Sequence, residues 1–206
     1  TPSASPSILL SEIMIDPMSV PDRDGEWIEL ANIGTAPVNL AGWMLGDFSG
    51  VEHVIAGDLW LAPGAYLLLA RSADVAANGG VTPHYLYTGV SLANGRDELL
   101  LLDPQERLVD LVLWGDDQLL TAPTGASLER AGLADPAHWV AAHSVWPGSA
   151  GDRGSPGAAY APPGTPTPTP TSTPTKTVTP TKTATATKTP TATKTPTATK
   201  TPTATK

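Results

Sequence analysis

The sequence has no cysteine, only one phenylalanine and no long uninterrupted apolar run. Without cysteine the chain forms no disulfide, binds no metal through thiolate and has no cysteine nucleophile. No stretch of roughly 18 apolar residues occurs, so the sequence predicts no membrane-spanning helix. The start at Thr1 lacks the basic and apolar parts of a secretory signal. We therefore expect that a leader has been removed or that the sequence is a fragment.

Lysine is missing from most of the chain and is confined to its end. All six lysines fall in residues 162–206, a segment made almost entirely of threonine, proline, alanine and lysine, in which Thr-Pro-Thr-Ala-Thr-Lys recurs. Such a composition cannot bury a core, and alternating threonine and proline favours extended polyproline II. We expect a disordered stalk or linker over 162–206, open to O-glycosylation, and a short linker over 1–6.

The part between these linkers, residues 7–161, is strongly acidic. It carries all 20 aspartates and glutamates against six arginines, which is a formal net charge of −14. This charge repels nucleic-acid phosphates and anionic lipid head groups. The lysines of the tail stand six residues apart, which is too dilute for a polybasic membrane anchor. We therefore expect no nucleic-acid partner and no membrane insertion.

Short apolar or alternating segments separated by glycine and proline recur along residues 7–161. In 26–30 polar and apolar residues alternate, which gives a strand one buried face. About nine or ten such segments at this spacing are typical of an all-β sandwich of short antiparallel strands. A helix is expected only around 72–78, where Ser72 could cap it and Gly79 would end it. The predicted strands are 8–15, 26–30, 43–45, 51–55, 65–70, 84–87, 98–102, 108–114, 127–130 and 138–140.

Several of these segments, in this order, resemble the lamin tail domain family. The most specific is Gly-Glu-Trp-Ile-Glu-Leu-Ala-Asn at 25–32, which is similar to the family's acidic-Trp-Ile-Glu-Leu-x-Asn strand. Residues 8–13 resemble its opening strand, and 38–45 resemble its Leu-x-Gly-Trp-x-Leu strand. Residues 61–64 resemble its Leu-x-Pro-Gly turn. Its later hairpin is matched by 92–102 with 109–110, and its closing signature by 125–130 with 155–157. The resemblance covers about residues 7–158.

The resemblance implies an immunoglobulin-like β-sandwich of the kind found in nuclear lamins and in bacterial surface and secreted proteins. In bacteria such domains often accompany secreted nucleases, phosphatases and other hydrolases, so the resemblance also implies an accessory role outside the cell. Trp27, Trp43 and Trp114 are the expected core anchors. Glu29 shares one face of its strand with Trp27, and an acid on a partly buried face needs a hydrogen-bond partner. We expect Arg130 to be that partner.

The sharpest candidate site is a calcium site in the acidic turn at 22–26. Asp22, Asp24 and Glu26 stand at alternate positions, and carboxylate oxygens are the ligands that Ca²⁺ prefers. The complete calcium-loop pattern is absent, because no acid stands at its closing position. The alternative is a solvated acidic turn that holds no metal. No other cofactor is indicated.

No catalytic motif stands out in the sequence. The four histidines form no zinc-hydrolase spacing, and neither a Gly-x-Ser-x-Gly elbow nor a phosphate-binding glycine loop occurs. We therefore predict that the protein is not an enzyme but a monomeric binding, adhesion or targeting module. It would be extracellular or displayed on the cell surface and would bind a protein, a glycan or a cell-wall polymer. Two alternatives stay open: a Ca²⁺-dependent hydrolase or metal-binding domain, and a structural bead of a surface array.

Overall fold

The computed structural model describes residues 7–115, 118, 120–133 and 137–163. The predicted linker at 1–6 and all but the first two residues of the predicted stalk lie outside these ranges. Within them, nearly all regular structure is β-strand, as predicted, and the single helical turn α1 (Asp22–Gly25) is the only helix described.

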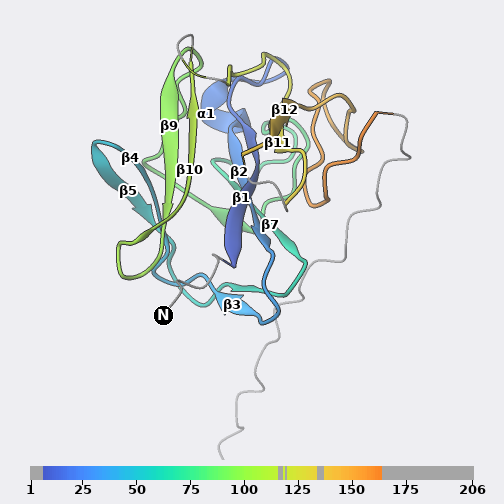
Figure 1. Ribbon diagram of the computed structural model, residues 1–206. Coiled ribbons are helices and arrows are strands. Elements are labelled where there is room, and N and C mark those ends of the chain that lie inside the picture. Colours follow the sequence, from blue (N-terminus) through green and yellow to red (C-terminus); the bar gives the residue numbers. More distant parts are fainter. Residues whose placement is uncertain (1–6, 116–117, 119, 134–136, 164–206) are drawn as a thin grey trace, which may run out of the picture. The chain divides into compact units, whose positions relative to one another are not determined.

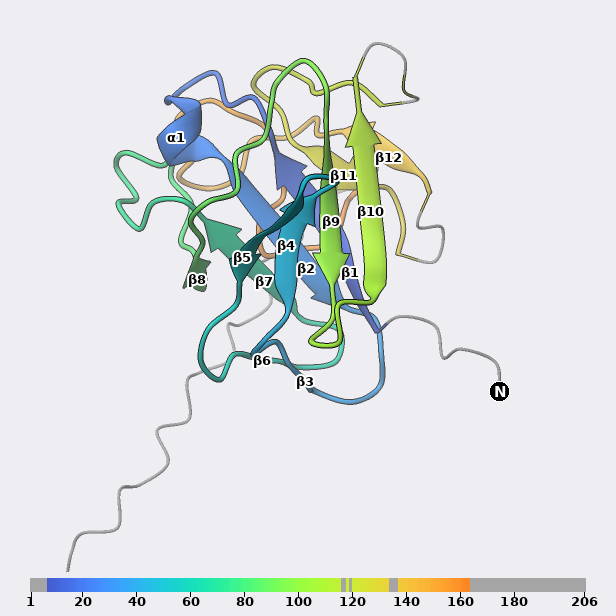
Figure 2. The same cartoon turned by 90° about the vertical axis from the view of Figure 1, so that its left-hand side faces the viewer.

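The strands form two sheets that lie face to face, and a short ribbon beside them (Figures 1 and 2). The larger sheet has the order β12 (Trp139–Ala141), β11 (Leu128–Arg130), β1 (Ile8–Met14), β2 (Trp27–Asn32), β7 (Tyr66–Ala70), β8 (Tyr85–Leu86). The smaller sheet has the order β10 (Leu108–Trp114), β9 (Asp97–Leu102), β4 (Met44–Asp47), β5 (Gly50–Val54). The ribbon pairs β3 (Val38–Asn39) with β6 (Trp60–Leu61). All pairings are antiparallel except that of β7 with β8.

The main core lies between the two sheets. Alternate residues of most strands point into it, as the period of two requires. On the larger sheet these include Ile28, Leu67 and Leu69, and on the smaller sheet Leu99 and Val112. Two of the three expected tryptophan anchors, Trp43 and Trp114, belong to this core and are 8% and 0% exposed.

A bulge in β1 decides which of its residues face the core. The pairing of β1 with β2 shifts register between Leu10 and Glu12, so that Ser11 is the extra residue of a β-bulge. Before the bulge Ile8 and Leu10 point into the main core, and after it Ile13 does so. Without the extra residue the alternation would carry Glu12 into the apolar core, so the bulge is what turns this acid to the opposite face.

A second apolar cluster covers part of the outer face of the larger sheet, the face turned away from the smaller sheet. It contains Trp27, Leu68 and Trp146 among its members, and the rings of Trp27 and Trp146 meet edge to face with centroids 6.1 Å apart. Trp27 is therefore buried, as predicted, but in this cluster and not between the sheets. Trp146 belongs to the chain at 143–158, which we call the closing segment because it crosses this outer face.

The structure departs from the predicted elements in three places. The helical turn α1 at Asp22–Gly25 was not predicted, because a helix was expected only around 72–78. The helix expected at 72–78 is wrong: after Asp74 the chain makes one turn, in which Ala77 and Asn78 donate to the Asp74 carbonyl. Gly79 and Gly80 follow with φ of 81° and 94°, a left-handed backbone that ends the turn at once. The two-residue strands β3 and β6 were not predicted, because two residues are too few for a periodic pattern.

Candidate functional site

Three glutamates lie side by side on the outer face of the larger sheet. Glu12 on β1 is the cross-strand partner of Glu129 on β11 and of Glu29 on β2. All three are buried: Glu12 is 1% exposed, Glu29 is 0% exposed and Glu129 is 4% exposed. We call Glu12, Glu29 and Glu129 the glutamate row. Like charges directly opposite one another on neighbouring strands destabilise a sheet, so this row needs a specific environment.

The closing segment supplies much of that environment. Its Ser155 donates to Glu12 from the backbone nitrogen at 2.8 Å and from the hydroxyl at 3.2 Å, and the Gly157 backbone nitrogen donates to Glu29. Hydroxyls of the sheet add bonds from Ser127 to Glu12 at 2.5 Å and from Ser11 to Glu29 at 2.9 Å. The Ser-Pro-Gly signature at 155–157 therefore fastens the end of the domain to the row.

Burial raises the pKa of each member of the row. For Glu29 the loss of hydration is the largest cause and raises the pKa to about 8. For Glu12 burial, followed by the neighbouring Glu29 and Glu129 carboxyls, raises the pKa well above its ordinary value. Burial likewise raises the pKa of Glu129. Burial beside other carboxyls favours the protonated form, so Glu29 is largely protonated at neutral pH, and the pKa values of Glu12 and Glu129 are shifted in the same direction.

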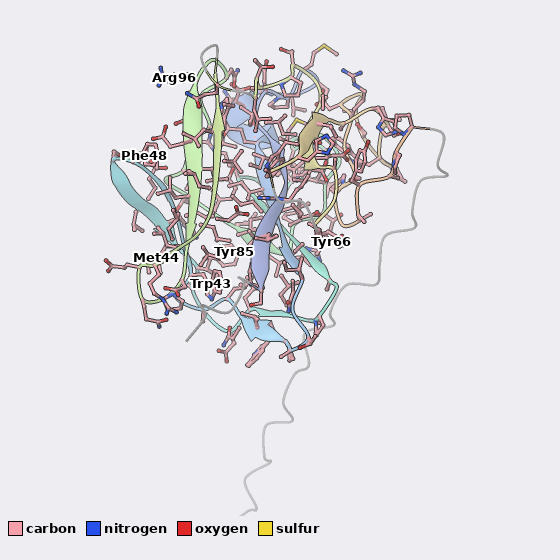
Figure 3. All side chains as sticks on the ribbon, in the orientation of Figure 1. Trp43, Met44, Phe48, Tyr66, Tyr85 and Arg96 are labelled. Carbon is pink, nitrogen blue, oxygen red and sulfur yellow. The ribbon has the colours of Figure 1, made fainter. Side chains whose placement is uncertain are left out.

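The row opens onto a small cavity and lies beside a larger groove. The cavity, of about 60 Å³, is lined by Glu12, Glu129, Tyr66 and Tyr160 among others. The groove, of about 480 Å³, is lined by Ala31, Asn32, Ile33, Gly34, Gly64, Tyr66 and Leu133. Tyr66 on β7 lines both, and Figure 3 labels it on the outer side of the larger sheet. We call the larger one the Tyr66 groove.

The Tyr66 groove has the chemistry of a site for an uncharged ligand. None of its lining residues carries a charge, and its volume is within the range of small-ligand sites, which is about 300–1,000 Å³. Tyr66 offers an aromatic face with a polar end. Burial, and then the nearby Glu29 and Glu12, raise the pKa of its hydroxyl, which therefore stays a hydrogen-bond donor.

The three predicted calcium ligands do not converge in the structure. Glu26 turns inward and accepts from the Arg71 guanidinium at 2.8 Å. Asp22 accepts from the Asn94 side-chain amide at 3.1 Å, and Asp24 pairs with its neighbour Arg23 at 3.2 Å. No group of three histidine, aspartate or glutamate side chains within the described ranges is arranged to hold a metal ion. The calcium site at Asp22, Asp24 and Glu26 thus gains no geometric support and stays a prediction.

The predicted pairing of Glu29 with Arg130 is wrong. Successive residues of a strand point to opposite faces, so on β11 Glu129 points outward and Arg130 toward the other sheet. There the Arg130 guanidinium donates to Asp110 of β10 at 2.6 Å and to the Leu10 carbonyl at 2.8 Å. It also stacks over the Trp139 ring, with Cζ 4.5 Å from the ring centroid. Glu29 instead depends on a hydroxyl and a backbone amide.

Sequence reasoning did not identify Glu12, Glu129 or Tyr66 as site residues. A signal for Glu12 exists, because it is the single acid in the largely apolar run at 8–15, and an acid in a buried strand marks a special environment. Glu129 and Tyr66 carry no comparable signal, because only the strand order brings β11 and β7 near β1.

Comparison with known protein families gives a match. A family model described as Lamin Tail Domain matches residues 1–116 of the 206-residue chain. No curated protein matches the chain. The matched part includes Glu12, Glu29 and Tyr66, whereas Glu129 and the closing segment lie beyond it. In the described ranges no helix is long and apolar enough to cross a membrane.

Proposed function

The chain belongs to the lamin tail domain family, and from this premise we propose that it is a non-catalytic binding module that holds an uncharged glycan or wall polymer in the Tyr66 groove. Domains of this family are immunoglobulin-like modules that often serve binding. In this proposal the domain acts outside the cell, the Thr/Pro/Lys segment is its spacer, and the module keeps a partner hydrolase near its substrate.

The observation that carries the proposal is the neutral, aromatic groove on an otherwise acidic domain. The formal charge of −14 on residues 7–161 disfavours polyanions such as nucleic acid. The Tyr66 groove lacks charged lining residues, and burial raises the pKa of each glutamate in the neighbouring row, that of Glu29 to about 8. A sugar ring, with one apolar face and many hydroxyls, suits a site that combines a tyrosine with uncharged polar groups.

A protein partner is the main competing ligand. Protein interfaces bury about 800 Å² on each partner and usually centre on exposed aromatic or arginine side chains. Tyr66 is partly buried and set in a groove, which suits a narrow ligand chain more than a broad surface. We therefore take a glycan or wall polymer as the proposed ligand and a protein as the contrary outcome.

Co-sedimentation with insoluble neutral polysaccharides and with purified cell-wall material would test the proposal. The full chain should sediment with at least one of them, and Tyr66→Ala should weaken that binding about tenfold or more, which is typical of losing a central aromatic contact. Trp60→Ala is the matched control, because Trp60 is 55% exposed on β6 and does not line the groove. Thermal melts should show that both variants fold.

Two results would contradict the proposal. The first is equal loss of binding in Tyr66→Ala and Trp60→Ala, which would move the site away from the groove. The second is that the chain binds no neutral polymer and instead binds a protein partner, and that Tyr66→Ala abolishes this protein binding.

A further inference from the structure

The chain contains the same reactive dipeptide twice, as Asn78-Gly79 and as Asn94-Gly95. In any Asn-Gly pair the backbone nitrogen of the glycine can attack the preceding side-chain amide, and glycine leaves this approach open because it has no Cβ. Whether the reaction occurs in a folded protein depends on how freely the asparagine side chain and the glycine backbone move. The two pairs differ sharply in this respect.

Asn78 is locked in the turn that follows Asp74. Its exposed fraction is 1%, and its side-chain nitrogen donates to the carbonyls of Ser72 at 2.9 Å and Val81 at 3.0 Å. Its side-chain oxygen accepts from the backbone nitrogens of Gly80 at 3.2 Å and Val81 at 3.1 Å. Both ends of the amide are held, so the side chain cannot turn toward the Gly79 nitrogen without local unfolding.

Asn94 lies in the exposed loop before β9, two residues before the labelled Arg96 in Figure 3. Only its side-chain nitrogen is held, by Asp16 and Asp22, with both distances 3.1 Å. Among the described residues no donor reaches its side-chain oxygen, and the Gly95 backbone nitrogen donates to no acceptor within the same ranges. A Cβ built on Gly95 meets no atom within 4 Å, so the backbone here is not packed against neighbours.

We propose that Asn94 is a site of spontaneous modification, at which the side-chain amide converts to a carboxylate through intramolecular attack by Gly95. The Gly95 nitrogen forms a bond to Asn94 Cγ, and the bond from Cγ to the side-chain nitrogen breaks. The proton lost by the Gly95 nitrogen leaves with that group as ammonia, and a cyclic imide remains. Water then opens the ring at one of its two carbonyls and gives aspartate or isoaspartate.

The position of Asp16 and Asp22 makes this change consequential. Their carboxylates accept from the nitrogen that leaves as ammonia, so the reaction removes the donor that joins them. The product puts a third carboxylate beside the two, and like charges so placed repel. The loop keeps its other anchors, which include the bond from Trp114 Nε1 to the Ala93 carbonyl at 2.8 Å. The expected effect is therefore a local loosening of the loop and α1, with the sandwich intact.

The test is to incubate the full chain at mildly alkaline pH and to follow both asparagines by peptide mass spectrometry. Cleavage at Arg71 and Arg96 leaves both asparagines on one peptide, since no lysine or arginine stands between them, so fragmentation must locate the change. In the folded chain residue 94 should convert more than about tenfold faster than residue 78, because Asn78 must first open locally. In concentrated urea the two should convert at similar rates.

Gly95→Ala is the matched variant. It adds a Cβ where no atom lies within 4 Å and should suppress conversion of Asn94 without changing the melting temperature. Asn94 staying intact in the folded chain while both sites convert in urea would overturn the proposal. Equal conversion of Asn78 and Asn94 in the folded chain would overturn it as well. Neither result bears on ligand binding in the Tyr66 groove.

Discussion

Raising the pH through neutrality should destabilise the domain, because the glutamate row gains most from folding when it is protonated. Glu29 has a folded pKa of about 8, against an ordinary value of 4.5. When folding raises the pKa of a group, its stabilisation is complete at a pH below the pKa in the unfolded chain. The stabilisation is lost as the pH rises through the pKa in the folded protein. The window therefore runs from about pH 4.5 to about pH 8.

The size of the effect follows from the same shift. One pKa unit corresponds to about 1.4 kcal/mol, so Glu29 alone should cost roughly 3 kcal/mol of unfolding free energy between about pH 5 and about pH 8. Glu12 and Glu129, whose pKa values are also raised, act with the same sign. With an urea m-value of about 1–3 kcal/mol/M, this loss would move the unfolding midpoint by roughly 1–3 M.

Glu29→Gln isolates this contribution, because glutamine resembles the protonated acid. Its oxygen can still accept from the Gly157 backbone nitrogen, and its amide can donate to the Ser11 hydroxyl. Urea unfolding across the pH window should show the variant close to the parent at acidic pH and about 3 kcal/mol more stable at about pH 8. Glu106→Gln, on the exposed turn between β9 and β10, is the control and should follow the parent. Parallel curves for parent and Glu29→Gln, or parent stability that rises over the window, would refute the reasoning.

Two further substitutions test other parts of the sandwich by the same urea assay. Asp110→Asn should lower the free energy of unfolding by about 3 kcal/mol, because it removes a carboxylate from the Arg130 guanidinium, whose side chain is 1% exposed. A loss below about 0.5 kcal/mol would show that the ion pair between the two sheets contributes little to stability. Tyr87→Phe should leave the stability unchanged or raise it by up to about 1 kcal/mol, because the buried Tyr87 hydroxyl has no hydrogen-bond partner among the described residues. A clear loss of stability in Tyr87→Phe would indicate that this hydroxyl is bonded in solution.

Short β-prone apolar segments bounded by turn residues predicted most of the strands. The segment at 25–32 forms strand β2, which buries Ile28 in the main core and Trp27 on the outer face. The expected strand at 108–114 coincides with β10. The failure at 72–78 has a local cause too, because an N-cap residue and a stop residue do not show whether the turn between them continues.

The site was harder to predict because it depends on contacts between distant segments. The sequence identifies Glu29 as an acid on a buried face, but its partner Gly157 belongs to the closing segment. The predicted partner Arg130 points the other way because it follows Glu129 by one residue on β11. A one-residue difference in a strand reverses the face, and no local pattern fixes that choice for a short strand.

The sequence by itself determined an all-β domain of the lamin tail type, its strongly acidic charge and most of its strands, because period-two patterning and composition act over a few residues. Only the tertiary structure decided that Glu12, Glu29 and Glu129 stand in one row and that the closing segment covers them. It also decided that Asn94 is held only at its side-chain nitrogen, while Asn78 is buried and held at both ends of its amide. These features depend on strand order, on the bulge at Ser11 and on burial, which arise only when segments far apart in the chain pack together.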